Sequence, residues 1–165
     1  MEKEEMNNAK AAMLRELHEE TGLSENDLES IRLKYVTLRY KNSEIRINYY
    51  FFGGLRENVV IRDYCDEDIF EWTNIDCVLK KEMPYSAKHV LDHYIKIGRY
   101  ADSTYCGVAH KNGVSFMEWP NFQMFSEKKI KCEKALISRL RLFEFESCVK
   151  IVILSLRGKK SIRKF

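Results

Sequence analysis

Three glutamates near the start of the chain have the spacing of one helix face. At about 100° per residue, Glu16, Glu19 and Glu20 fall within roughly one 100° sector of a helix surface. Carboxylates crowded in this way repel each other, and a divalent cation relieves the repulsion. Oxygen ligands of this kind suit Mg²⁺ or Mn²⁺. Arg15 precedes Glu19 by four residues and can pair with it. Spacing alone fits an ordinary solvated charged face equally well.

The helix that must carry these glutamates is predicted over residues 9–21. Asn7 or Asn8 can cap its N-terminus, and the alanines and leucines that follow are strong helix formers. Gly22 stands where a left-handed C-terminal cap is wanted, and Leu23 supplies the apolar contact that usually follows it.

The string Arg-Glu-Leu-His-Glu-Glu-Thr-Gly-Leu at residues 15–23 resembles the second half of the Nudix hydrolase signature. That signature is G-x5-E-x7-R-E-U-x-E-E-x-G-U, where U is aliphatic, and every specified position from the arginine onward is matched. The resemblance extends over about residues 8–97. Counting back from Arg15, Asn7 and Met1 stand where the signature has its earlier glutamate and first glycine. The chain is therefore expected to be an N-terminally truncated member of the family.

The resemblance implies a hydrolase that cleaves a diphosphate linkage in a nucleoside di- or triphosphate derivative. By that resemblance, Glu16, Glu19 and Glu20 would hold Mg²⁺, with Mn²⁺ as the other candidate, and Arg15 would orient them. In such enzymes the metal neutralises phosphate charge and positions the attacking water. The expected partner is a small nucleotide-type substrate.

The general base is predicted in an acidic loop at residues 63–68. Glu67 is favoured there over Asp66 and Asp68, although each alone is more often a solvated loop carboxylate. The unmatched start of the signature favours an alternative to catalysis. In that alternative the chain is a non-catalytic Nudix-like remnant that binds a nucleotide, a metal or a protein partner.

Hydrophobic periodicity predicts an α/β fold, a Nudix-like mixed sheet sandwiched by helices and lacking the usual first strands. The missing strands would expose a sheet edge, which makes a homodimer possible. The expected domains are residues 1–123, a Nudix-like domain incomplete at its N-terminus, and residues 124–165, a basic C-terminal extension. Within the first domain, the sequence predicts a hairpin with strands at 31–40 and 45–52, whose return strand is half-buried. A helix between Pro84 and Gly98 and an extra hairpin at 105–119 follow it. In the C-terminal part, a helix at 126–142, a strand within 143–156 and a solvated tail from residue 156 are expected.

Composition excludes several classes of protein. The chain has 165 residues, of which 45% are hydrophobic, and its net charge of +3 is too small to argue for nucleic-acid binding. It has neither a signal peptide nor an apolar run that could span a bilayer, so a cytoplasmic location is expected and no membrane partner. His89 and His93 have a zinc-compatible spacing but are expected on a solvated helix face. The aromatic side chains Tyr49, Tyr50 and Phe51 could stack on a base, although core positions are the usual outcome.

Overall fold

The computed structural model describes residues 8–57, 59, 72–119, 135–137, 141–144 and 150–161, the last three segments by their backbone alone. Its helical elements are α1 (Ala9–Thr21), η2 (Glu25–Asp27), α2 (Ile75–Val78), α3 (Tyr85–Lys96) and η3 (Gly98–Tyr100), where η marks a 3₁₀ turn. Its strands are β1 (Leu28–Lys41), β2 (Glu44–Leu55), β3 (Trp72–Asn74), β4 (Thr104–His110), β5 (Gly113–Trp119), β6 (Ala135–Ile137), β7 (Arg141–Glu144) and β8 (Lys150–Ser161).

The strands of the described residues form one mixed sheet. Their order is β3-β7-β8-β2-β1-β4-β5, and β6 pairs with β8 beside this path. The pairs β1/β4 and β3/β7 are parallel, and the other pairs are antiparallel. A parallel pair needs a crossover, and α2 and α3 lie in the long connection between β2 and β4.

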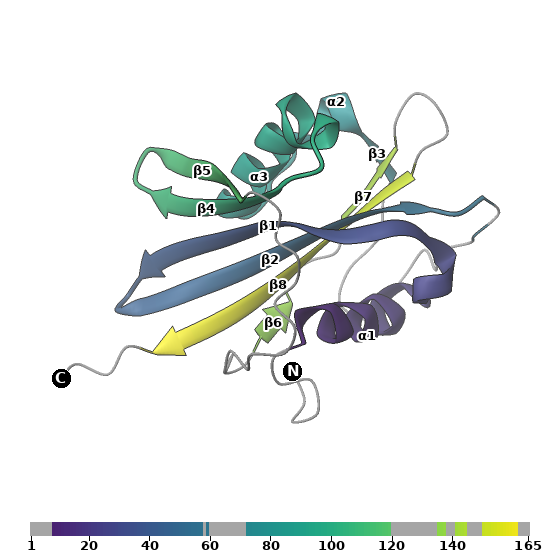
Figure 1. Cartoon of the computed structure of the whole chain (residues 1–165), viewed down its shortest axis with the longest axis horizontal. Helices are drawn as coiled ribbons and strands as arrows, with labels where there is room; N and C mark the ends of the chain where they lie inside the picture. The colour runs from purple at the N-terminus through teal and green to yellow at the C-terminus, as the bar shows by residue number, and fades with distance from the viewer. Residues whose placement is uncertain are drawn as a thin grey trace.

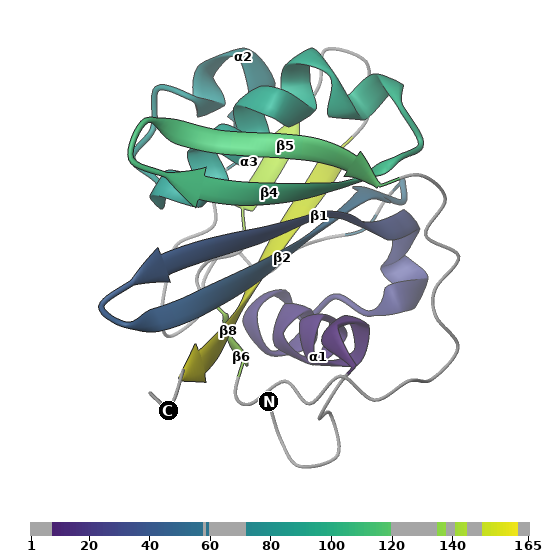
Figure 2. The same cartoon turned by 60° about the vertical axis from the view of Figure 1, so that its left-hand side comes forward.

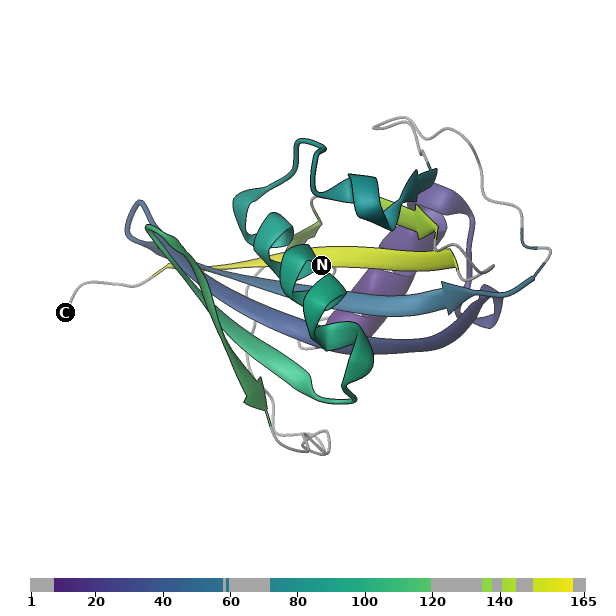
Figure 3. The ribbon, with the colours of Figure 1, turned by 90° about the horizontal axis from the view of Figure 1, so that it is seen from above.

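Helices cover both faces of this sheet (Figure 1). Helix α1 packs against one face, while α2 and α3 lie over the other, and Figure 2 shows the β4–β5 hairpin alongside α3. The α/β class and the predicted sheet between helices are therefore confirmed. Seen from above, α3 crosses the strands at a steep angle (Figure 3). The buried residues of the α1 side are Ala12, Met13, Leu17, Leu23, Leu28, Phe51 and Leu55. Those of the α3 side are Tyr35, Tyr50, Phe52, Ile75, Val78, Val90, Leu91, Tyr94 and Tyr105.

The β1–β2 hairpin lies where the sequence predicts it, but its return strand is not half-buried. Phe51 packs toward α1 and its neighbours Tyr50 and Phe52 pack toward α3, so both faces of β2 are covered. The turn residues Asn42 and Ser43 have φ of 53° and 60°, the left-handed pair that suits a tight hairpin. The β4–β5 hairpin also lies where it was predicted.

The C-terminal part of the chain differs from the prediction. Strands β6 and β7 include or overlap residues of the stretch predicted as a helix, and β8 runs on to Ser161, so the predicted solvated tail is wrong through that residue. Strand β8 lies between β7 and β2 and pairs with β2 over its whole length. The division expected at residues 123 and 124 thus does not separate two sheets. Long-range pairing fixed these elements, which local patterns could not specify.

Candidate functional site

Helix α1 has the caps that the sequence predicts. Asn8 Oδ1 accepts a bond of 3.0 Å from Ala11 N–H at its start. Gly22 has φ 76° at its end, and its N–H donates to the His18 carbonyl at 2.8 Å. The buried residues of the helix, among them Met13 and Leu17, face the sheet. Glu19 is exposed, whereas Glu16 and Glu20 are only partly exposed and lie beside the buried face of the helix.

Arg15 pairs with two of the three predicted metal ligands. Its Nη1 lies 2.6 Å from Glu19 Oε2, and its Nη2 contacts Glu16 Oε1. The side chain of Glu16 is 23% exposed and that of Glu19 is 55% exposed, so water reaches both carboxylates. Glu20 is half-buried. The guanidinium therefore lies beside two of the three carboxylates, and the orienting role of Arg15 stays a prediction.

The carboxylates are not gathered into a ready-made metal centre. Among the described residues, no group of three or more histidine, cysteine, aspartate or glutamate side chains could hold a metal ion. The donors themselves fit Mg²⁺, which commonly takes one or two protein carboxylates and completes its shell with water and substrate oxygens. Two ligands from α1 would satisfy that requirement, with Arg15 as the competing cation.

The predicted general base, Glu67, lies outside the described residues, as do Asp66 and Asp68. The candidate aromatic partners are described, and they belong to the core. Tyr50 and Phe51 are buried, and Tyr49 packs against the α1 cluster. None of the three is placed to stack on a base from solvent.

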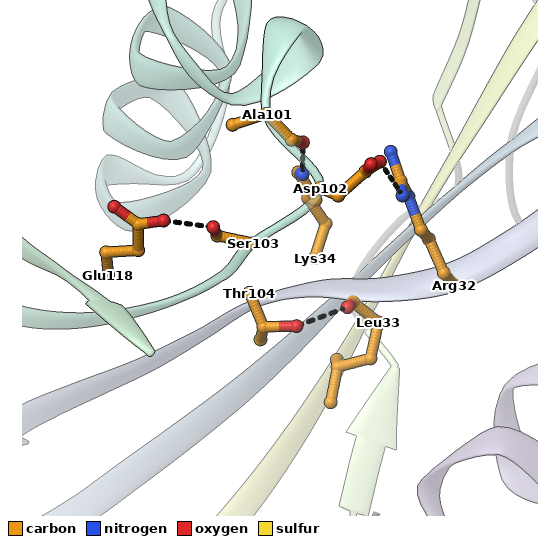
Figure 4. Close-up of polar contacts among 8 residues, drawn as sticks. All are labelled: Arg32, Leu33, Lys34, Ala101, Asp102, Ser103, Thr104 and Glu118. Carbon is orange, nitrogen blue, oxygen red and sulfur yellow. Dashed lines mark hydrogen bonds and ion pairs between the residues drawn. The ribbon is translucent and has the colours of Figure 1, made fainter. Parts of the chain in front are cut away.

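A buried lysine that the sequence analysis missed lies on the opposite side of the sheet (Figure 4). Lys34 is 1% exposed, its Nζ donates to the Ala101 carbonyl, and it lies 5.7 Å from the centre of the Tyr105 ring. Burial, and to a smaller degree the positive charge of Arg32, lower the pKa of Lys34 from 10.5 to about 8. Asp102 and Glu118 raise that pKa, but less than burial lowers it.

The bonds around Lys34 tie the start of β4 to β1. Arg32 Nη1 lies 2.8 Å from Asp102 Oδ1, and Thr104 Oγ1 donates to the Leu33 carbonyl at 3.2 Å (Figure 4). Ser103 donates to Glu118 in the same cluster. Because Lys34 is buried and already hydrogen-bonded, we interpret this cluster as a structural one that joins β4 to β1. The signal available in the sequence was a lysine between the apolar residues Leu33 and Tyr35.

His93 is not on a solvated face, which corrects the sequence prediction. Its Nδ1 lies 2.9 Å from the Tyr35 hydroxyl, and its ring contacts those of Tyr105 and Phe116. Burial lowers the pKa of His93 and raises that of Tyr35. His89 instead lies edge-on against the Tyr85 ring. The two histidines therefore do not share a zinc site.

Comparison with known protein families, with curated proteins and with solved structures finds no match for this chain. No helix in the described part of the chain is both long and apolar enough to cross a membrane. The functional argument therefore rests on the residues of α1 and their surroundings.

Proposed function

We propose that this chain is a Nudix-type hydrolase that cleaves a diphosphate linkage in a nucleoside di- or triphosphate derivative. The observation that carries the proposal is the pairing of Arg15 with Glu16 and Glu19 on α1. The same nine residues that resemble the family signature form the last turns of a capped helix, and its arginine is bonded to its glutamates. Those contacts follow from the spacing of the string in a helix, and they place its arginine beside two of its carboxylates.

The chain's own residues have distinct tasks in this proposal. Glu16 and Glu20 are four residues apart on one stripe of α1 and would hold Mg²⁺, and Glu19 keeps Arg15 beside them. The bound ion neutralises phosphate charge during the reaction. Water forms the new bond to phosphorus, the bridging P–O bond breaks, and the leaving phosphate takes its electron pair. A carboxylate accepts the proton of the water, and Glu67 is the candidate for that role.

The test compares two single-carboxylate variants. The purified chain is assayed for release of phosphate or pyrophosphate from nucleoside triphosphates and diphosphate-linked nucleotides, with and without Mg²⁺. Glu20→Gln should lower Mg²⁺-dependent turnover by about a hundredfold or more, because it removes a ligand that acts on developing charge. Glu25→Gln is the matched control, since Glu25 is an exposed carboxylate on η2 that pairs with Lys10 at 2.5 Å. It should retain full activity.

One observation favours the non-catalytic alternative. Arg15 already pairs with Glu16 and Glu19, so a metal ion would have to compete with a cation that the chain itself supplies. Calorimetric titration with Mg²⁺ and with a non-hydrolysable nucleoside triphosphate separates the two functions. Nucleotide binding by folded protein without turnover would establish the binding function. Equal turnover of Glu20→Gln and the unchanged chain would remove α1 from the mechanism.

A further inference from the structure

A row of cationic positions crosses three adjacent strands on the α3 side of the sheet. The register pairs Arg39 of β1 with Arg46 of β2, and Arg46 with Lys159 of β8. Directly paired positions share a sheet face and lie about 5 Å apart. We call Arg39, Arg46 and Lys159 the basic row. Like charges directly opposite one another destabilise a sheet, so this arrangement needs a compensating anion.

Arg46 carries a hydrogen-bond donor that is left without a partner. Its Nε is buried and has no hydrogen-bond partner within the described part of the chain. Its Nη2 reaches Glu44 Oε2 only at 3.7 Å, a long contact for an ion pair. A buried N–H of a charged group is costly to leave unsatisfied. The Arg46 side chain as a whole is 28% exposed, so an acceptor oxygen from a ligand can reach the outer part of the same guanidinium.

A second unsatisfied polar group lies one step along the same face. Asn48 is 6% exposed, and its Nδ2 donates to Thr37 Oγ1 at 3.2 Å. Its Oδ1 is buried and has no partner among the described residues. Because the Thr37 hydroxyl can donate as well as accept, the opposite amide orientation keeps this bond and leaves Nδ2 as the unsatisfied donor. The register places Arg157 opposite Asn48, which adds another cationic position.

The N-terminal end of α3 holds one end of the basic row in place. The Arg39 guanidinium lies 5.4 Å from the centre of the Tyr85 ring, at the first residue of α3. The Tyr85 hydroxyl in turn donates to the His110 carbonyl at 3.0 Å, which ties the helix to the β4–β5 turn. A cation held on an aromatic ring keeps its N–H donors available and loses little freedom on binding.

We propose that the basic row binds a chain of phosphates. Its three positions span two strand spacings, about 10 Å. This length is greater than the width of one phosphate group and matches several consecutive phosphates. Arginine is the side chain best suited to such oxygens, since its planar group bonds phosphate through two N–H donors. The phosphate chain belongs to a single-stranded nucleic acid or to a free polyphosphate. The row lies on the face opposite α1, so this site is independent of the proposed hydrolase.

The experiment measures binding to the full chain by fluorescence anisotropy of a labelled single-stranded oligonucleotide, with unlabelled inorganic tripolyphosphate as competitor at constant ionic strength. The test variant is Arg39→Gln/Arg46→Gln. The control is Lys10→Gln/Arg99→Gln, which removes the same charge from α1 and from η3, beyond the other end of α3. The test variant should bind about tenfold more weakly, and its salt slope should fall by about 1.4, since each single-strand phosphate contact contributes about 0.7. The control should stay within about twofold of the unchanged chain.

Thermal unfolding separates loss of binding from loss of folding. Removing two opposed like charges should leave the Tm of the test variant unchanged or raise it, while tripolyphosphate should raise the Tm of the unchanged chain and of the control variant but not that of the test variant. If tripolyphosphate displaces the labelled oligonucleotide, a phosphate chain alone is sufficient for binding to the basic row. Oligonucleotide binding without such competition identifies a nucleic-acid strand. Equal binding by the test and control variants, or no binding of either probe, overturns the proposal. Glu20→Gln should bind as the unchanged chain does, whatever its activity.

Discussion

The two faces of the sheet treat charge in different ways. On the α1 face, Arg15, Glu16 and Glu19 form contacts within one helix, where water still reaches them. On the α3 face, Lys34 is fully buried against residues about 70 positions away in the chain. The Tyr35 hydroxyl likewise reaches His93 from another element. The first set is held by local spacing, and the second by the tertiary fold.

This difference separates function from stability. Exposed pairs within a helix contribute little to folding, so their spacing is free to serve a ligand. Buried polar groups are costly unless each is bonded, and once bonded they fix one arrangement of the chain. We therefore expect substitutions on the α3 side to change stability, and substitutions on the exposed surface of α1 to change activity.

The largest expected effect is at Gly98. A Cβ added there would lie 2.0 Å from the Tyr35 hydroxyl oxygen and 3.4 Å from Tyr94. Tyr35 has no room to move, because its ring contacts Phe52 at 5.8 Å and its hydroxyl is bonded to His93. Gly98→Ala should lower the free energy of unfolding by about 2–3 kcal/mol, the usual cost of overpacking. Urea denaturation measures this change.

Gly54→Ala is the matched control. Its added Cβ would lie 3.5 Å from the Glu29 Cβ, an ordinary contact. Alanine in a strand is no worse than glycine, so the free energy of unfolding should stay within about 0.5 kcal/mol of the original. An equally small change from both substitutions would show that the α3 side tolerates crowding and that its contacts are not specific.

The second prediction concerns the pH dependence set by Lys34. Its pKa is lowered from 10.5 to about 8, so the unfolded chain binds more protons than the folded one between those values. Stability therefore rises with pH across that window, by about 3 kcal/mol in all at 1.36 kcal/mol per unit, of which about 2 kcal/mol falls between pH 7.5 and 9.5. Lys34→Met should remove this rise. The difference between the two chains in free energy of unfolding is measured from pH 7.5 to 9.5.

Subtracting the free energy of unfolding of Lys34→Met from that of the unchanged chain removes the contributions of other groups that titrate in the same pH range. Tyr35 and Tyr105 have raised pKa values and are present in both proteins. Parallel stability profiles for the two chains would mean that Lys34 titrates normally and that burial does not penalise its charge.

The sequence predicts what depends on neighbours along the chain. Helix α1 has the predicted bounds, because Asn8 and Gly22 act through bonds to residues within four positions. Both hairpins follow from alternation and from their turn residues, such as Asn112 before Gly113. The pairing of Arg15 with Glu19 follows from the four-residue spacing in the same way.

What the sequence does not predict depends on distant partners. The position of β8 beside β2 joins residues about 100 or more positions apart, and the local pattern near Arg157 indicates only a basic tail. The burial of Lys34 depends on a register shift in β1 between Leu33 and Tyr35, which no periodicity signals. His93 lies on the polar side by helical spacing alone, yet it contacts Phe116, a β5 residue that packs against the α3 core.

The smallest expected effect is at Arg15, and it tests the α1 side of the comparison. Arg15→Gln breaks the pairs with Glu16 and Glu19, whose carboxylates keep contact with water. Exposed pairs of this kind contribute about 0–1 kcal/mol, so urea denaturation should show a loss below about 1 kcal/mol. The freed carboxylates should then bind Mg²⁺ more tightly in calorimetric titration, because a competing cation is gone. A loss of about 2 kcal/mol or more would instead mean that Arg15 neutralises a buried charge at Glu16, as a missing partner does in a buried pair. The charged groups on both faces of the sheet would then be buried and stabilise the fold, and the acidic surface of α1 would have a structural role whether or not it binds a ligand.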